Sequence, residues 1–280
     1  MTDSKHVETE LNQGVLTVTL NRPDRLNAWT ETMQGQLETA ILNAGRDPKI
    51  GCIILTGAGR GFCAGADMDG LQKISPEANA PHRSSRPVIA APFPDAPGPG
   101  VESLFSGRFG YMFSCPKPII CAINGPIAGI GLVLSLYADL RFAACEAKFT
   151  TAFAQRGLIA EHGISWLLPR LVGEAHALDL LFTARKFLGP EAERIGLVNK
   201  ALPLNELLPH VEQVARHMAT QVSPRSIAVM KRQVRAAYFQ SFSEALDTAD
   251  QEMNASFRTQ DFKEGVASFV ERRPPVFTGR

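Results

Sequence analysis

The segment Pro118-Ile-Ile-Cys-Ala-Ile-Asn-Gly-Pro-Ile-Ala-Gly-Ile-Gly131 decides the fold. Its pattern predicts a strand buried on both faces over 118–123, a glycine turn, and an apolar helix over 129–138. An earlier stretch has the same order: the buried run Cys52-Ile-Ile-Leu55 leads into Thr56-Gly-Ala-Gly-Arg-Gly-Phe-Cys-Ala-Gly-Ala-Asp67. A repeated unit of strand, glycine turn and helix predicts an α/β protein.

The flanking regions differ in character. Alternating apolar residues around Asn12-Gln13-Gly14 predict a hairpin over 7–20, and a four-residue apolar spacing predicts a helix over 30–44. Apolar faces at helical spacing predict a helical region over 201–280 after a core over 1–200. Its last three helices are expected at 223–237, 242–258 and 262–272. No internal repeat is evident beyond the doubled unit of strand, turn and helix.

A proline-rich insertion over 72–108 interrupts the predicted core. Residues 76–99 hold seven of the 19 prolines, a density that no helix or central strand tolerates. The insertion is either a disordered surface segment or a loop that becomes ordered over a ligand.

The composition bounds the class of protein. With 280 residues the chain forms one large domain or two smaller ones, and a net charge of +1 argues against a polybasic nucleic-acid scaffold. No apolar run is long enough to span a membrane, and the N-terminus lacks a signal core, so a cytoplasmic protein is expected. The cysteines are interpreted as reduced and buried, with no metal site: Cys52, Cys63, Cys115, Cys121 and Cys145.

The two glycine turns can carry chemistry. Two backbone N–H groups that converge on one carbonyl oxygen form an oxyanion hole, and one such donor contributes about 3–4 kcal/mol to a transition state. Each turn could equally be structural only. Neither fits a phosphate loop or a dinucleotide fingerprint, and no nucleophile elbow exists.

Four motifs in order resemble the enoyl-CoA hydratase/isomerase (crotonase) family from about residue 7 to the end. They are Asn21-Arg-Pro-Asp-Arg-Leu-Asn-Ala28, Gly61-Phe-Cys-Ala-Gly-Ala-Asp67, residues 118–131, and Phe262-Lys-Glu-Gly-Val-Ala-Ser-Phe-Val-Glu-Arg-Arg273. The resemblance implies a spiral of repeated ββα units with a C-terminal helical region that forms a homotrimer or a dimer of trimers. It also implies an acyl-CoA thioester substrate and an oxyanion hole from the N–H groups of Ala66 and Ile130. Ile130 stands where the family usually has glycine, so its side chain could crowd the acyl pocket.

The resemblance also implies a CoA site and no separate cofactor, since CoA is part of the substrate. The expected CoA residues are Arg25, Leu26, Ala28, Ala64, Gly65, Asp67, Phe269 and Arg272. Arg25 and Leu26 would lie beside the pantetheine or the phosphates, and the Ala64 backbone against adenine. Asp67 is interpreted mainly as a helix cap that organises the CoA loop. Phe269 and Arg272 would come from a neighbouring subunit, although Arg272 could equally be a solvated helix charge.

The acid groups leave the reaction open. Hydratases of this family carry two glutamates, which align here with Val133 and Phe153. Glu161, at an expected helix start, aligns with a catalytic aspartate of other members. The neighbouring His162 would tune it, act as a second base, or only cap the helix.

One carboxylate suits a 1,3-proton shift by an isomerase. Atypical hydration remains open, with Glu161 and His162 or Glu102 replacing the usual pair. A hydrolase or dehalogenase with Glu161 as nucleophile and a non-catalytic CoA-binding oligomer are alternatives. RNA binding is disfavoured because no basic stretch exists.

Overall fold

The computed structural model describes residues 5–67, 92–93, 96–98 and 107–280. The strands are β1 (Val7–Asn12), β2 (Val15–Leu20), β3 (Cys52–Gly57), β4 (Ile119–Ile123), β5 (Ile127–Ala128), β6 (Leu140–Ala144), β7 (Lys148–Thr150), β8 (Phe187–Leu188) and β9 (Lys200–Leu202). The helices are α1 (Glu31–Arg46), α3 (Gly110–Ser114), α4 (Ile130–Leu136), α5 (Ile164–Val172), α6 (Glu174–Thr183), α7 (Gly189–Arg194), α8 (Leu204–Gln221), α9 (Pro224–Ala236), α10 (Phe242–Ser256) and α11 (Gln260–Glu271). Short 3₁₀ turns are η1 (Pro23–Arg25), η2 (Ala154–Arg156) and η3 (Ala237–Phe239).

The described strands form two sheets. The larger has the order β1-β2-β3-β4-β6-β9, parallel except for the β1–β2 hairpin, and the smaller has the order β5-β7-β8. In the units β4–β5 and β6–β7 the first strand joins the large sheet and the second joins the small one. The predicted α/β spiral of repeated ββα units is therefore confirmed. Most of the proline-rich insertion lies outside the described residues.

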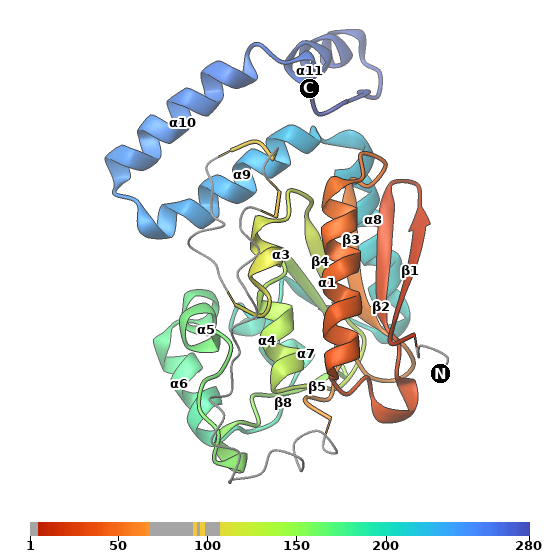
Figure 1. Ribbon diagram of the computed structural model, residues 1–280, viewed down its shortest axis with the longest axis vertical. Helices are drawn as coiled ribbons and strands as arrows, with labels where there is room; N and C mark the ends of the chain where they lie inside the picture. Colours follow the sequence, from red (N-terminus) through yellow and green to blue (C-terminus); the bar gives the residue numbers. More distant parts are fainter. Residues whose placement is uncertain (1–4, 68–91, 94–95, 99–106) are drawn as a thin grey trace.

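Two helices cover the large sheet (Figure 1). Helix α1 begins where the Thr30 side chain accepts a hydrogen bond from the Met33 N–H, and it buries Leu37 and Ile41 in the core. Helix α8 buries Leu207 and Val211 while packing against β2, β3, β4, β6 and β9. The expected division at residue 200 thus falls just before a helix that packs on the sheet, and it stays a prediction.

The predicted helices that fall within the described residues are present, with shifted ends. Helix α1 runs two residues past the expected end, because Asp47 is the first extended residue after it. Helix α4 is shorter than predicted: Gly129, with φ 49°, precedes it, and Tyr137 follows it. Helix α11 begins two residues earlier than predicted, because Thr259 caps it by accepting a hydrogen bond from the Phe262 N–H.

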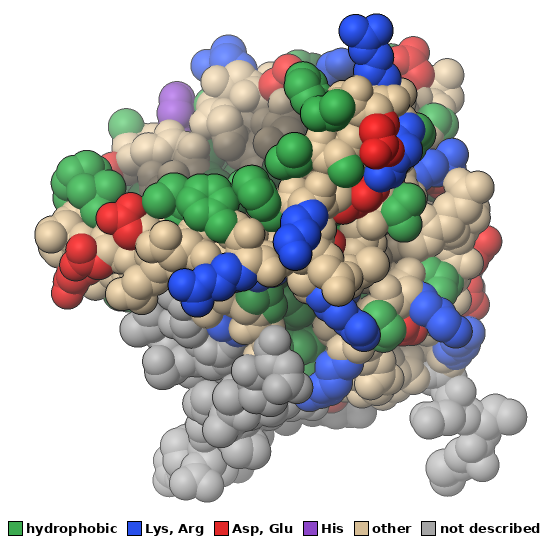
Figure 2. Space-filling view, turned by 90° about the horizontal axis from the view of Figure 1, so that it is seen from above, with side chains coloured by type: hydrophobic (Ala, Val, Ile, Leu, Met, Phe, Trp, Pro, Cys, Tyr) green, Lys and Arg blue, Asp and Glu red, His purple; other side chains and the backbone are tan. Residues whose placement is uncertain are grey.

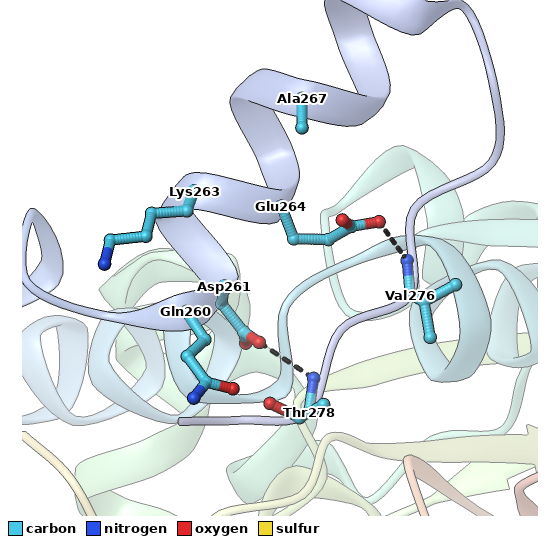
Figure 3. A pocket seen from close by; sticks show the side chains of 7 residues that line it. All are labelled: Gln260, Asp261, Lys263, Glu264, Ala267, Val276 and Thr278. Carbon is cyan, nitrogen blue, oxygen red and sulfur yellow. Dashed lines mark hydrogen bonds between the residues drawn. The ribbon is translucent and has the colours of Figure 1, made fainter.

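The C-terminal tail folds back onto α11 (Figure 3). The buried Asp261 carboxylate accepts hydrogen bonds from the N–H groups of Thr278 and Gly279, and Glu264 accepts one from the Val276 N–H. Hydrogen bonds from Arg273 also hold the pKa of Glu264 down to about 2. A hollow of about 350 Å³ remains between helix and tail. Two carboxylates that line it, those of Asp261 and Glu264, accept hydrogen bonds from the backbone of the tail.

A half-buried charge cluster joins α9 to the sheet. The Lys231 ammonium lies 2.8 Å from the Asp139 carboxylate and donates to the carbonyl oxygens of Met112 and Lys117. Arg235 lies 3.3 Å from the other Asp139 oxygen, and the Ile119 N–H donates to Asp139. The Asp139 carboxylate therefore balances the charge of two cations and accepts a hydrogen bond from the first residue of β4.

Removing that carboxylate should destabilise the fold. Asp139→Asn leaves Lys231, whose side chain is 6% exposed, without its counter-charge. Losing one partner of a buried pair typically costs about 3–5 kcal/mol of unfolding free energy. Urea titration should show a loss of this order. The control Glu31→Gln, at a carboxylate 75% exposed opposite Arg108, should change stability far less. Equal effects of the two substitutions would contradict the prediction.

Candidate active site

The two glycine turns lie side by side. Cys63 and Ile127 form a parallel backbone bridge: the Cys63 N–H donates to the Pro126 carbonyl oxygen, and the Ala128 N–H donates to the Cys63 carbonyl oxygen. A Cβ atom at Gly131 would overlap that same Cys63 oxygen, so the contact requires glycine. Three residues beyond the bridge on each segment stand Ala66 and Ile130, the two expected oxyanion donors.

Both expected donors have N–H groups available. On one side of Ala66, the Trp29 N–H donates to the Gly65 carbonyl oxygen and the Asp67 N–H donates to the Trp29 carbonyl oxygen. These two bonds place Ala66 in the middle of a parallel backbone bridge, so its own N–H points away from Trp29. Ile130 is the first residue of α4, so its N–H has no partner within the helix. No hydrogen bond between described residues uses either N–H group.

Two asparagine side chains that the sequence analysis did not single out fix the first turn. The fully buried Asn27 donates to the carbonyl oxygens of Ala58 and Gly61 and accepts from the Arg22 N–H. Asn124 donates to the carbonyl oxygens of Gly57 and Gly59 from the second turn. Asn27 has a left-handed φ of 56°, a conformation that Asn tolerates better than most residues with a side chain, and no local pattern in the sequence signals its bonds to the turn.

The structure gathers six of the expected CoA residues at this turn. The Ala64 N–H donates to the Leu26 carbonyl oxygen, which joins η1 to the glycine turn and leaves Arg25 exposed beside it. Arg22 donates to the Ala28 carbonyl oxygen and to Asp67. Asp67 thus organises this loop, while residues 68 onward, where the expected helix would begin, lie outside the described part. Gly65 has a φ of 106° and is buried against Ala128.

The other two expected CoA residues lie elsewhere in this chain. Phe269 and Arg272 are on α11 or at its end, and both are exposed, Phe269 to 85%. Figure 1 shows α11 at the opposite end of the molecule from β5. One protomer does not bring them to the turns.

The positions of the two usual hydratase glutamates are apolar and buried. Val133 is fully buried on α4, where its N–H donates to the Gly129 carbonyl oxygen. Phe153 is 5% exposed, and its ring would lie 4.0 Å from a Cβ atom built at Gly129. Both side chains flank the start of α4, and neither can carry a proton.

The expected acid lies in a short loop before α5. Helix α5 begins at Ile164 after Gly163, so Glu161 lies just before the start of a helix, as expected. The Glu161 side chain is 33% exposed, and its Oε2 lies 3.8 Å from the His162 Nε2. The Tyr137 hydroxyl donates to the His162 carbonyl oxygen at 2.9 Å. This loop is therefore fixed to the C-terminal end of α4.

The cysteines are free, and four are buried. Burial raises the pKa of Cys52, Cys63 and Cys121 to about 12, so these thiols stay protonated at neutral pH. Among the described residues, no helix has the length and apolarity to cross a bilayer, and no cluster of three His, Cys, Asp or Glu side chains could hold a metal ion.

Comparison with known proteins identifies the family. Residues 10–87 and 102–280 match the enoyl-CoA hydratase/isomerase family. The chain belongs to the enoyl-CoA hydratase/isomerase family. Its relatives include the 1,2-epoxyphenylacetyl-CoA isomerase of Escherichia coli K12, 36% identical over 275 residues that cover 98% of this chain and 97% of the relative. A probable enoyl-CoA hydratase of Rhodobacter capsulatus is 32% identical over 275 residues, 98% of each chain.

Solved structures of family members share the fold. An enoyl-CoA hydratase from Bacillus anthracis superposes with a TM-score of 0.86 at 26% identity, covering 99% of this chain and 100% of the other. A probable enoyl-CoA hydratase/isomerase from Mycobacterium abscessus gives 0.83 at 30% identity, covering 98% and 99%. The protein is thus an enzyme of the acyl-CoA hydratase/isomerase type.

Gly131 tests the contact between the turns. Gly131→Ala places a methyl group against the Cys63 carbonyl oxygen, so the backbone segments must separate. A displacement near 1 Å can reduce turnover about a hundredfold, and we expect acyl-CoA turnover to fall by about that factor. Steady-state kinetics would measure it.

Gly35→Ala is the matched control. A Cβ atom at Gly35, inside α1, meets nothing within 4 Å. That variant should keep full activity and gain about 0.5–1 kcal/mol of stability. Normal turnover by Gly131→Ala would show that the contact does not set the geometry of the site.

Proposed function

We propose that this enzyme forms a thioester enolate in the oxyanion hole of Ala66 and Ile130, with Glu161 as acid and base. The observation that carries the proposal is the bridge between the two turns, with both N–H groups free of partners among the described residues. Donors already aimed at a developing negative charge need no rearrangement during the reaction. They therefore stabilise the transition state more than the substrate.

A 1,3-proton shift is the reaction we favour. The Glu161 carboxylate takes a proton from the α-carbon of a 3-enoyl-CoA, and the electron pair moves onto the thioester oxygen. The N–H groups of Ala66 and Ile130 stabilise that charge. The protonated Glu161 then returns the proton to the γ-carbon, and the 2-enoyl-CoA forms. One carboxylate serves both steps, so no second acid is needed.

Val133 and Phe153 support proton transfer over ordinary hydration. Hydration needs a base for the water and an acid for the α-carbon, yet both positions carry buried hydrocarbon side chains. The relatives do not separate the two reactions, because one is named as an isomerase of an epoxyphenylacetyl-CoA and another as a probable enoyl-CoA hydratase. The His162 Nε2 lies 3.8 Å from the Glu161 Oε2, so a second side chain that can carry a proton stands beside the proposed base.

We further propose that CoA binds along η1 and the first glycine turn. Arg25 there is exposed and can pair with phosphate, while the backbone at Leu26 and Ala64 can line the path of the pantetheine and adenine. The proposed chemistry uses no cofactor beyond the CoA of the substrate itself.

A homotrimer or a dimer of trimers would complete the site. Helix α10 buries none of its residues within the chain, and α11 buries only Asp261 and Ser268. Viewed from this end, hydrophobic side chains gather in a row (Figure 2). Exposed apolar residues of these helices include Phe242, Leu246, Met253, Phe257, Val266, Phe269 and Val270. An apolar surface of this kind marks an interface, which we assign to copies of this chain. Phe269 and Arg272 would then reach a neighbour's CoA.

Two substrates separate the reactions. With a 3-enoyl-CoA, we expect the absorbance of the conjugated thioester to rise, and with a 2-enoyl-CoA we expect little loss of it. Glu161→Gln should lower the rate of isomerisation by at least about a hundredfold, because the amide cannot accept the α-proton. Glu174→Gln, an exposed acid in the first turn of α6, is the matched control and should keep full activity.

Other outcomes would replace the proposal. Loss of the 2-enoyl signal would indicate hydration, and release of CoA thiol would indicate a hydrolase with Glu161 as nucleophile. Tight CoA binding without turnover would indicate a non-catalytic CoA-binding oligomer. Full activity of Glu161→Gln would remove Glu161 from the mechanism.

The assembly has its own test. Light scattering should find three or six copies of the 30.4 kDa chain at micromolar concentration. Leu246→Glu places a charge within the apolar face of α10 and should shift the protein toward smaller species. Lys263→Glu, a charge change at an already polar position of α11, should not. A wild-type monomer would contradict the proposed assembly.

A further inference from the structure

Tyr137 joins α4 to the loop that carries Glu161. Its hydroxyl donates to the His162 carbonyl oxygen at 2.9 Å across 25 residues of chain. The ring is 8% exposed and packs against Phe113, with centroids 4.7 Å apart, and against Phe109 at 5.5 Å. Burial raises the pKa of the Tyr137 hydroxyl to about 12, so it remains a donor throughout the neutral range.

The loop needs such a tether because its backbone is in an uncommon conformation. His162 has a φ of 53° and Gly163 a φ of 83°, both in the left-handed region. For a residue with a side chain, that region costs of order 1 kcal/mol and persists only where the surroundings hold it. A Cβ atom at Gly163 would lie 2.9 Å from the Tyr137 hydroxyl oxygen. The tyrosine and the loop are therefore in close contact.

Helix α4 bears parts of the site at both ends. Ile130 begins the helix and offers its N–H to the oxyanion hole, and all seven residues from Ile130 to Leu136 are buried. Tyr137 follows directly and holds the acid loop. A short, fully buried helix is a rigid spacer, because its neighbours are close-packed.

The Tyr137 ring is also linked, through Phe109, to the residue that pairs with Ala66. Phe109 packs edge-on against both Tyr137 and Trp29, with centroids 5.5 Å apart in each pair. Trp29 is the residue whose backbone pairs with Ala66. Aromatic contacts thus connect Trp29, which pairs with Ala66, to Tyr137, which binds the His162 loop.

We propose that Tyr137 is a positioning residue, whose hydroxyl holds the Glu161 carboxylate at a fixed place relative to the oxyanion donors. The inference rests on the proposed function, since it assigns Glu161 the proton transfer. Tyr137 itself touches no reacting atom. Its effect passes through the His162 carbonyl oxygen, one residue beyond Glu161.

Tyr137→Phe is the direct test, because it removes the hydroxyl and keeps the ring packing. The loop then loses its donor and samples other positions. We expect kcat for isomerisation to fall by about tenfold while KM stays within about twofold, since CoA binds at a different turn. Steady-state kinetics with a 3-enoyl-CoA would measure both constants.

Ser135→Ala is the matched control on the same helix. Ser135 is fully buried, and its hydroxyl donates to the Leu132 carbonyl oxygen at 2.7 Å within α4. Each substitution removes one hydrogen bond from a hydroxyl group to a backbone carbonyl oxygen. Only the Tyr137 bond leads to the loop that carries Glu161. Thermal unfolding of both variants gives their midpoint temperatures. The constants kcat and KM are then measured below both midpoints, where both variants are folded.

The outcomes are distinct. A fall in kcat for Tyr137→Phe, with Ser135→Ala near wild type, supports the inference. Equal kcat in the two variants overturns it, as does a rise in KM with kcat unchanged. Glu161→Gln, assayed in parallel, distinguishes failure of the positioning role of Tyr137 from failure of the proposed function of Glu161. If it is inactive while Tyr137→Phe behaves like the control, positioning fails and the proposed function stands. If it is fully active, the proposed function fails.

Discussion

The backbone bridge between Cys63 and Ile127 is the constraint on which the site depends. It joins two turns that are separated by more than sixty residues, and it sets Ala66 and Ile130 at equal offsets from the point of contact. Glycine at position 131 permits the approach, and the amides of Asn27 and Asn124 hold the first turn to its shape. Because the proposed oxyanion hole consists of backbone groups, isoleucine at position 130 keeps the N–H group that the proposal requires.

The same rigidity extends to the acid. Glu161 directly precedes His162, whose left-handed φ of 53° persists in a residue with a side chain only where the surroundings hold it. Tyr137 restrains this loop from the end of α4, and the start of α4 carries Ile130, one of the two proposed oxyanion donors. In the proposed mechanism, one buried helix therefore relates the charge on the thioester oxygen to the group that moves the proton. Val133 and Phe153 are buried apolar side chains, so neither position near that helix offers a second acid.

The sequence predicts much of this architecture, because buried aliphatic runs and glycine turns are local patterns. The strands β3 and β4, the hairpin, and helix α1 follow from spacing within a few residues. The non-local contacts do not follow. Nothing in the chain near Tyr137 signals a hydrogen bond to residue 162, and nothing near Asn27 signals its bonds to the turn at Gly61. The expected helix start after Glu161 does follow from the sequence, because α5 begins at Ile164.

A crystal structure with a bound, unreactive acyl-CoA analogue tests the central claim most directly. The thioester oxygen should lie about 2.7–3.1 Å from both the Ala66 and the Ile130 backbone nitrogen atoms. The Glu161 carboxylate should face the α-carbon from the loop held by Tyr137. A thioester oxygen bound to only one of the two nitrogen atoms, or to neither, would contradict the assignment of the oxyanion hole.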